Sequence, residues 1–257
     1  MKTAETPINT LPARLPREDG HSIAYHTREG KSPGVLFLGG FKSDMTGTKA
    51  TALDDFCRRE GRAYTRFDYL GHGASSGKFT EGTIGRWLVD ALAVLDRVTA
   101  GPQIIVGSSM GGWIAALLAL ARPDRVAGLV TLAAAPDFTA RLIEARLTAE
   151  DRAMLARDGK IVDPSDYDPE GYEITKDLID EGREHLILGR PQPIRCPVRM
   201  IHGDHDTDVP WALSAELLDA VESADATMTL VKGADHRLSS PADIARMEAA
   251  IAELAGA

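Results

Sequence analysis

The sequence predicts an α/β fold in which a mostly parallel, doubly wound sheet carries helices on both faces. Short β-branched or apolar runs alternate with longer segments of helical periodicity, which is the pattern of such a sheet. The chain of 257 residues has an apolar fraction of 44%, enough to bury a sheet between two helical layers. We therefore expect residues 1–257 to form a single domain.

The expected strands are short and largely apolar, as buried parallel strands are. They lie near residues 21–26, 33–39, 62–68, 103–107, 127–133, 197–202 and 226–231. The expected helices lie near residues 47–60, 83–99, 110–122, 211–223 and 241–255. The last helix has the clearest start, because Ser240 and Asp243 have capping-box spacing and Pro241 suits a first helical turn.

The alternation of strands and helices stops between Pro136 and Arg195, a stretch far longer than an ordinary connection. Helical runs are expected within it at 139–147, 149–157 and 172–188. A segment that leaves the carboxyl end of a parallel strand emerges where open α/β sheets bind ligands. We therefore expect residues 137–195 to form a helical lid, or cap, over the site.

Apolar lid residues at helical spacing are candidates to line a substrate pocket. They are Leu142, Ile143, Leu147, Ile174, Leu178 and Ile179, and we select Leu142, Ile143, Leu178 and Ile179 as the predicted substrate contacts. The alternative interpretation is that these side chains only seat the lid on the core.

Gly107-Ser-Ser-Met-Gly111 is the clearest functional motif in the chain. It stands between an apolar strand and an apolar helix, where a G-x-S-x-G run predicts a nucleophile elbow. The serine of such a turn has a strained backbone, and small flanking residues let the strand and the helix approach. Ser109 is therefore the predicted nucleophile.

Ser109 needs a histidine to accept its proton and a carboxylate to hold that histidine, and α/β-hydrolases carry the three in the order Ser, Asp, His. A predicted strand runs into Gly203-x-x-Asp206-x-x-Val209-Pro210, whose spacing resembles the acid loop of these enzymes. The resemblance identifies Asp206 as the acid. Asp204 and Asp208 are close enough in sequence to be alternatives.

The remaining parts of a hydrolase site also have candidates. His236 follows the last predicted strand on a loop, where a general base belongs. The strand near 33–39 ends in Gly39-Gly40-Phe41, which in the hydrolase interpretation is the third strand and its oxyanion loop. The backbone N–H groups of Phe41 and Met110 would then donate to the oxyanion.

Two other interpretations of polar segments are disfavoured. Residues 202–208 contain histidines and aspartates that could bind a metal, but no helical His-x-x-x-His pair or cysteine accompanies them. The glycine-rich run 71–77 has neither a P-loop nor a dinucleotide signature. It resembles a structural turn after the fourth strand of α/β-hydrolases. We expect no metal and no cofactor.

Composition limits the kinds of partner and the cellular locations that we expect for this protein. A net charge of −9 argues against nucleic acid, and no apolar window reaches membrane-spanning length. Residues 1–20 have no secretory apolar run and balance three basic against three acidic residues, unlike an acid-poor mitochondrial presequence. We therefore expect a cytoplasmic protein that acts on a small-molecule or acyl-bearing substrate. Cys57 and Cys196 imply no disulfide framework, and nothing predicts an oligomeric state.

With these motifs placed, the chain resembles the α/β-hydrolase superfamily over nearly its whole length. Within it the chain is similar to the group of mitochondrial palmitoyl-protein thioesterases. The segments that carry this likeness are 32–37, 46–50, 66–71, 106–113, 209–211 and 235–237. The group is described as removing S-acyl groups from proteins and hydrolysing acyl glucuronides, so the resemblance implies an acyl-ester or thioester substrate.

The sequence thus predicts a serine hydrolase that cleaves carboxylic esters or acyl thioesters through an acyl-enzyme. A C–C bond hydrolase or a perhydrolase could use the same triad, and the sequence does not separate these activities. A non-catalytic ligand-binding homologue is a further alternative. It is disfavoured because all three triad residues are present.

Overall fold

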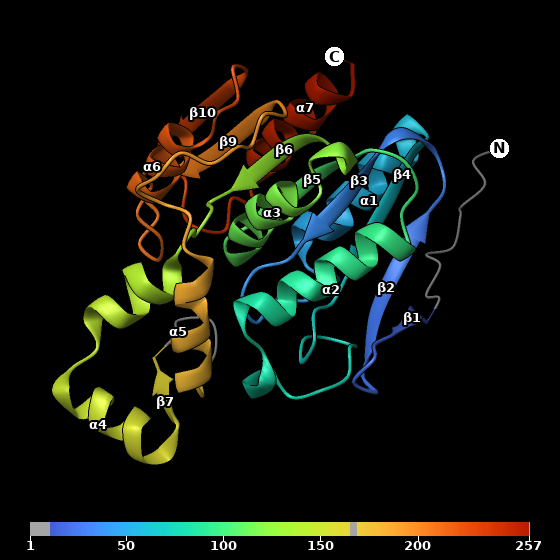
Figure 1. Ribbon diagram of the computed structural model, residues 1–257. Coiled ribbons are helices and arrows are strands. Elements are labelled where there is room, and N and C mark those ends of the chain that lie inside the picture. Colours follow the sequence, from blue (N-terminus) through green and yellow to red (C-terminus); the bar gives the residue numbers. More distant parts are fainter. Residues whose placement is uncertain (1–10, 165–168, 257) are drawn as a thin grey trace.

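The computed structural model describes residues 11–164 and 169–256, and it contains an eight-stranded sheet in the order β1-β2-β4-β3-β5-β6-β9-β10 (Figure 1). The strands are β1 Ala13–Pro16, β2 Ser22–Arg28, β3 Lys31–Leu38, β4 Arg62–Phe67, β5 Gln103–Ser108, β6 Val126–Leu132, β9 Val198–Gly203 and β10 Ala226–Val231. β2 pairs antiparallel with β1 and β4, and the pairs from β4 through β10 are parallel. The predicted mostly parallel sheet is confirmed. β1, the short edge strand, was not predicted.

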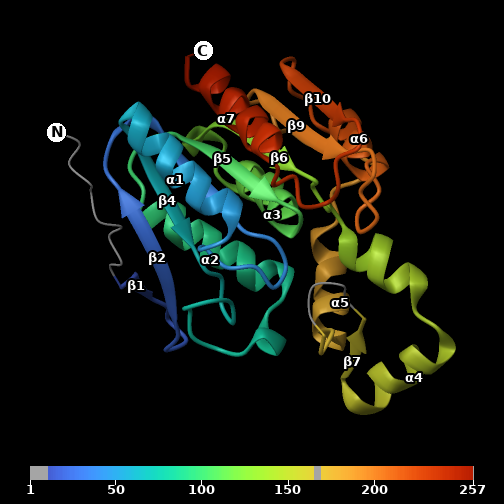
Figure 2. The same ribbon diagram turned by 180° about the vertical axis from the view of Figure 1, so that it is seen from behind.

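Helices cover both faces of the sheet (Figures 1 and 2). One face carries α2 Ile84–Arg97, α3 Met110–Ala121 and α6 Ala212–Ala220, and the other carries α1 Thr48–Glu60 and α7 Pro241–Gly256. Successive strand side chains point to opposite faces, so β3 contributes Leu36 and Leu38 to one buried cluster and Val35 and Phe37 to the other. The sheet is therefore buried on both sides, as its apolar runs predicted.

The segment between β6 and β9 has its own secondary structure. It contains a π-helix Thr139–Glu144, α4 Ala149–Asp158, a hairpin of β7 Lys160–Asp163 and β8 Tyr172–Thr175, and α5 Lys176–Gly182. Figure 1 shows it beyond the carboxyl ends of β6 and β9. Residues 165–168, which fall in the turn-rich break expected around 163–169, lie outside the described residues.

The prediction of a helix over 172–188 is wrong for residues 172–175, and the observed helix α5 ends earlier than predicted, at Gly182. Residues 172–175 form β8, which pairs antiparallel with β7, and α5 begins only at Lys176. The Thr175 hydroxyl accepts a hydrogen bond from the backbone N–H of Leu178 at 3.1 Å, which caps the helix start. Hairpin pairing with β7, between residues that are 9 to 15 positions apart in sequence, therefore overrides the local helical periodicity of this stretch.

Two carboxylates hold the segment in place. The Asp137 carboxylate accepts backbone hydrogen bonds from Ile187 and Leu188, both at 2.9 Å, and is buried. It therefore joins the entry of the segment to its exit. Glu181 of α5 accepts from the N–H of Gly85 in the first turn of α2 at 2.9 Å, where the helix dipole favours an anion.

Candidate active site

Ser109 occupies a sharp turn between β5 and α3. Its φ of 55° and ψ of −120° are unfavourable for a residue with a side chain. A Cβ on Gly111 would lie 2.2 Å from the carbonyl oxygen of Leu38 on β3, so glycine is required where the helix passes this strand. The G-x-S-x-G spacing thus reflects a close approach of backbones, and the turn projects the serine at the carboxyl end of the sheet.

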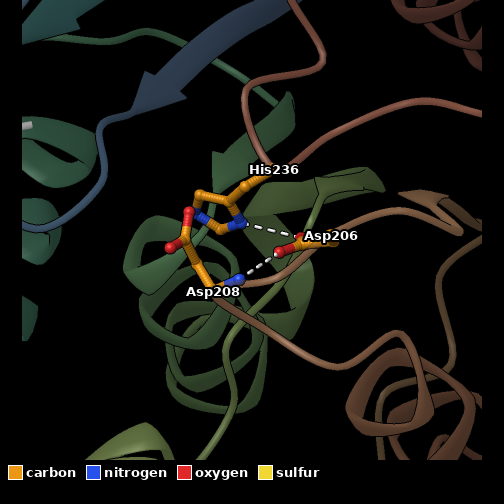
Figure 3. Close-up of side chains that lie close together, drawn as sticks. All are labelled: Asp206, Asp208 and His236. Carbon is orange, nitrogen blue, oxygen red and sulfur yellow. Dashed lines mark hydrogen bonds and ion pairs between the residues drawn. The ribbon is translucent and has the colours of Figure 1, made fainter. Parts of the chain in front are cut away.

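The three predicted triad residues form one hydrogen-bonded chain. The Ser109 hydroxyl lies 3.1 Å from Nε2 of His236, and Nδ1 of His236 lies 2.7 Å from Oδ2 of Asp206. Figure 3 shows the bond between His236 and Asp206. The side chain of Asp206 is fully buried, whereas that of His236 keeps 17% of its surface exposed. This is the geometry of a nucleophile, a base and an orienting carboxylate.

Asp206 is held by four N–H donors. Oδ1 accepts from the backbone N–H groups of Asp208 at 3.0 Å and Val209 at 2.8 Å, and Oδ2 accepts from His236 at 2.7 Å and His202 at 3.0 Å. Burial by itself would raise the pKa of Asp206, but the hydrogen bonds from His202 and His236 outweigh it and hold the pKa below its ordinary range. The carboxylate is therefore ionised at neutral pH.

The two alternative acids have different surroundings. Asp204 accepts from the N–H of Gly233 at 2.5 Å and pairs with Lys232 at 3.0 Å, so it joins the loops that follow β9 and β10. Asp208 lies near the triad, where ligand atoms of Asp206, Asp208 and His236 are within 4.8 Å of one another (Figure 3). The four donors on Asp206 already occupy its roughly four acceptor positions, so this trio fits a metal ion poorly.

The predicted oxyanion donors, Phe41 and Met110, both lie on the wall of the cavity that contains Ser109. The loop that carries Phe41 is fixed by His72, which sequence reasoning missed. The backbone N–H of Lys42 donates to Nε2 of His72 at 3.2 Å, and Lys42 has a φ of 57°. Burial lowers the pKa of His72 to about 4, so the ring is neutral and free to accept.

A cavity of about 580 Å³ opens at Ser109 and His236 and is closed on one side by residues of the 137–195 segment. Leu142 and Ile143 line it, and so do Tyr172 and Ile174 of β8. The prediction for Leu178 and Ile179 needs correction. Their side chains are 2% and 3% exposed and pack in the buried apolar cluster. The reason is that α5 starts later than expected and turns its apolar face toward the core.

A strained serine between a parallel strand and a helix, hydrogen-bonded to a loop histidine, defines an α/β-hydrolase fold. The family model for the alpha/beta hydrolase fold matches residues 35–160. Bovine mitochondrial palmitoyl-protein thioesterase ABHD10 is 43% identical over 90% of this chain and 75% of its own length, and the human protein is 41% identical over the same shares.

Similarity to solved structures supports the same family assignment. Alpha/beta hydrolase domain-containing protein 10 from mouse is 39% identical with a TM-score of 0.88, covering 95% of this chain and 98% of its own. A protein from Agrobacterium vitis S4 is 42% identical with a TM-score of 0.91, covering 97% of this chain and all (100%) of its own. The chain therefore belongs to the α/β-hydrolase family, in the group of the ABHD10 proteins.

Membership in this family confirms the predicted enzyme class, a hydrolase of carboxylic esters or thioesters.

The predicted cytoplasmic location is contradicted, because the mammalian relatives are named as mitochondrial proteins. That prediction relied on the charge balance of residues 1–20, of which 1–10 lie outside the described part of the chain. In the part that the structure describes, none of the helices combines the length and apolarity that a bilayer crossing requires.

Proposed function

We propose that this enzyme hydrolyses acyl thioesters and carboxylic esters through an acyl-enzyme on Ser109. The single observation that carries the proposal is the chain of hydrogen bonds from Ser109 through His236 to the buried, ionised Asp206, at a cavity lined by both apolar and polar side chains. Such a chain activates a serine that would otherwise be a weak nucleophile.

In the proposed reaction, Nε2 of His236 takes the proton of Ser109 as Oγ attacks the acyl carbonyl carbon. The backbone N–H groups of Phe41 and Met110 donate to the oxyanion, where preorganised donors have their largest effect. The imidazolium then protonates the leaving sulfur or oxygen atom as its bond to the acyl carbon breaks, and the thiol or alcohol departs. His236 next deprotonates a water molecule that attacks the acyl carbon, and the imidazolium returns this proton to Oγ of Ser109 as the carboxylic acid leaves. Asp206 stays ionised and stabilises the imidazolium in both half-reactions.

Residues 137–195 are proposed to be a lid within the single domain 1–257, with Leu142 and Ile143 against the acyl chain. Both line the cavity beside Tyr172 and Ile174, so an acyl group bound to Ser109 would meet an apolar wall from this segment. The cavity volume of about 580 Å³ is in the range of small-molecule sites. The relatives' name, palmitoyl-protein thioesterase, supports a long acyl chain as the substrate group.

Hydrolysis of acyl thioesters and p-nitrophenyl esters of increasing chain length tests the proposal, with Ser109→Ala as the paired variant. We expect turnover with both ester types in the wild type, labelling of the wild type by a fluorophosphonate, and neither in the variant. A wild type that binds these compounds without turnover or labelling would instead be a ligand-binding homologue.

A further inference from the structure

Behind the triad lies a second histidine that the proposed mechanism does not use. We infer that His202 and Ser214 are positioning residues for the reaction and hold Asp206 in the orientation that serves His236. This inference rests on the proposed function of the same site and extends the chain of hydrogen bonds to five side chains.

Both residues are completely enclosed by the protein. His202 is the penultimate residue of β9 and Ser214 lies in the first turn of α6, and each is 0% exposed. Nδ1 of His202 lies 2.7 Å from the hydroxyl of Ser214. Nε2 of His202 lies 3.0 Å from Oδ2 of Asp206 and 2.9 Å from the carbonyl oxygen of Val209. The imidazole thus spans the space between a helix and the acid loop.

The partners of His202 determine where its proton resides. A carbonyl oxygen can only accept, so Nε2 of a neutral His202 must carry the hydrogen and donate toward Val209 and Asp206. Nδ1 is then an acceptor, and the Ser214 hydroxyl donates to it. Ser214 therefore fixes the tautomer of His202, in the way that a hydrogen bond to one ring nitrogen fixes the other.

The consequence for Asp206 is that Oδ2 accepts an imidazole N–H from each of two histidines, His202 and His236. Oδ1 is held by the backbone of the acid loop. Rotation of the carboxylate away from His236 would break the bond to His202 as well, so both histidines favour the same orientation. Without His202, Oδ2 would lose a donor in a site that water does not reach, which is costly for a buried charge.

If His202 only filled space, an apolar side chain of similar size could replace it, and the hydroxyl of Ser214 would be dispensable. The positioning role predicts instead that an N–H donor at the Nε2 position is what matters. His202→Gln can supply such a donor, whereas His202→Leu cannot.

The experiment compares His202→Leu, His202→Gln and Ser214→Ala with Leu213→Ala, a buried α6 variant of a residue that has no part in this chain of hydrogen bonds. We expect His202→Leu to lower kcat by about 10- to 100-fold with little change in KM, the size expected for a misplaced catalytic group. His202→Gln should recover most of that loss, and Ser214→Ala should lose less than His202→Leu. Leu213→Ala should lower Tm while kcat stays near the wild-type value.

A second readout does not depend on activity. The hydrogen between His236 and Asp206 should give a low-field proton NMR signal that is absent in Asp206→Asn. We expect this signal to shift or broaden in His202→Leu and Ser214→Ala and to be retained in Leu213→Ala. An unchanged signal together with unchanged kcat in His202→Leu would overturn the inference. So would a His202→Gln variant that is no better than His202→Leu in both measurements.

The two proposals can fail separately. If the wild type hydrolyses no ester or thioester, the proposed function fails, and the NMR comparison still decides whether His202 positions Asp206. If His202→Leu does not fold, Ser214→Ala and His202→Gln decide the same question, because both keep the buried volume nearly filled.

Discussion

The triad region and the 137–195 segment are subject to different physical constraints. In the triad region each turn imposes a backbone geometry that few residues satisfy, as at Ser109 with its positive φ and at Gly111 against Leu38. In the 137–195 segment the main requirement is apolar surface facing the core, which many sequences can supply. Motifs therefore mark the first region, whereas the second has none. The two regions should also respond differently to mutation.

The largest effect should come from Ser109→Ala. Loss of the nucleophile is expected to lower kcat by about 10⁵- to 10⁶-fold, because the remaining groups then act only through binding and the oxyanion donors. Alanine fits the same turn, so the circular dichroism spectrum should not change. Ser108→Ala is the matched control and should keep near-wild-type turnover. The reverse pattern, with Ser108 essential and Ser109 dispensable, would mean that the register of the elbow is misassigned.

Asp206→Asn should have the next largest effect. Neutralising a triad aspartate removes the acceptor that fixes the tautomer of the histidine and is expected to cost about 10⁴-fold in kcat. Asp204→Asn should retain most activity, because Asp204 pairs with Lys232 and Gly233. Asp208→Asn is also expected to retain most activity. Steady-state kinetics at pH 7.5 on all three variants checks this. A larger loss of kcat in Asp208→Asn than in Asp206→Asn would identify Asp208 as the catalytic acid instead.

The 137–195 segment should control selectivity more than rate. Leu142→Ala and Ile143→Ala are expected to change the ratio of long-chain to short-chain ester turnover by about tenfold, the size of effect that apolar contacts give. Leu178→Ala is the control, since Leu178 packs in the core instead of lining the cavity. It should lower Tm and leave the ratio unchanged. If Leu178→Ala changed selectivity and the cavity variants did not, the lid proposal would be wrong.

His72 should make the loop that carries Phe41 sensitive to acid. Its pKa is lowered to about 4 in the folded protein, against an ordinary 6.5, so the unfolded chain binds more protons between these values. The contribution of neutral His72 to the free energy of unfolding is therefore fully present above pH 6.5 and is lost as the pH drops toward 4. Urea unfolding of the wild type and His72→Gln at pH 7.5 and pH 5 should show about 1–2 kcal/mol more loss in the wild type. An equal loss in both would indicate that His72 does not titrate in this window.

The smallest effect should come from the surface of the 137–195 segment. Glu144 pairs with Arg183 through two short contacts, at 2.7 Å and 3.1 Å, but both side chains are partly exposed. Glu144→Gln is therefore expected to cost less than about 1 kcal/mol of unfolding free energy, and less still in high salt. Thermal unfolding at low and high ionic strength measures this. A cost of several kcal/mol would show that this segment depends on specific polar contacts after all.

The sequence could predict those features that local chemistry determines. Ser240 and Asp243 marked the start of α7, where their side chains do form reciprocal hydrogen bonds with the backbone. Ser109, Asp206 and His236 could be selected because each follows a predicted strand in a known order. Their mutual distances could not be predicted.

The features that sequence reasoning missed depend on contacts that the periodicity of a single segment does not reveal. Tyr172–Thr175 becomes a strand because β7 is beside it, and His72 becomes an acceptor because Lys42 lies next to it in space. Neither partner is visible in the local pattern. The position of His202 directly before Gly203, at the end of a buried strand, was the one local signal for a further polar contact at the acid loop.

The Asp137 carboxylate gives the 137–195 segment a property useful for protein engineering. Because it binds the backbone of Ile187 and Leu188, residues 138–186 start and finish at a single point of the core. The cost of closing a loop grows only slowly with its length, so residues between this junction and the other core contacts of the segment, such as Glu181 with Gly85, can differ in number. Under the lid proposal, a segment 138–186 grafted from a relative with these contacts kept should transfer chain-length preference and leave the catalytic turn unchanged.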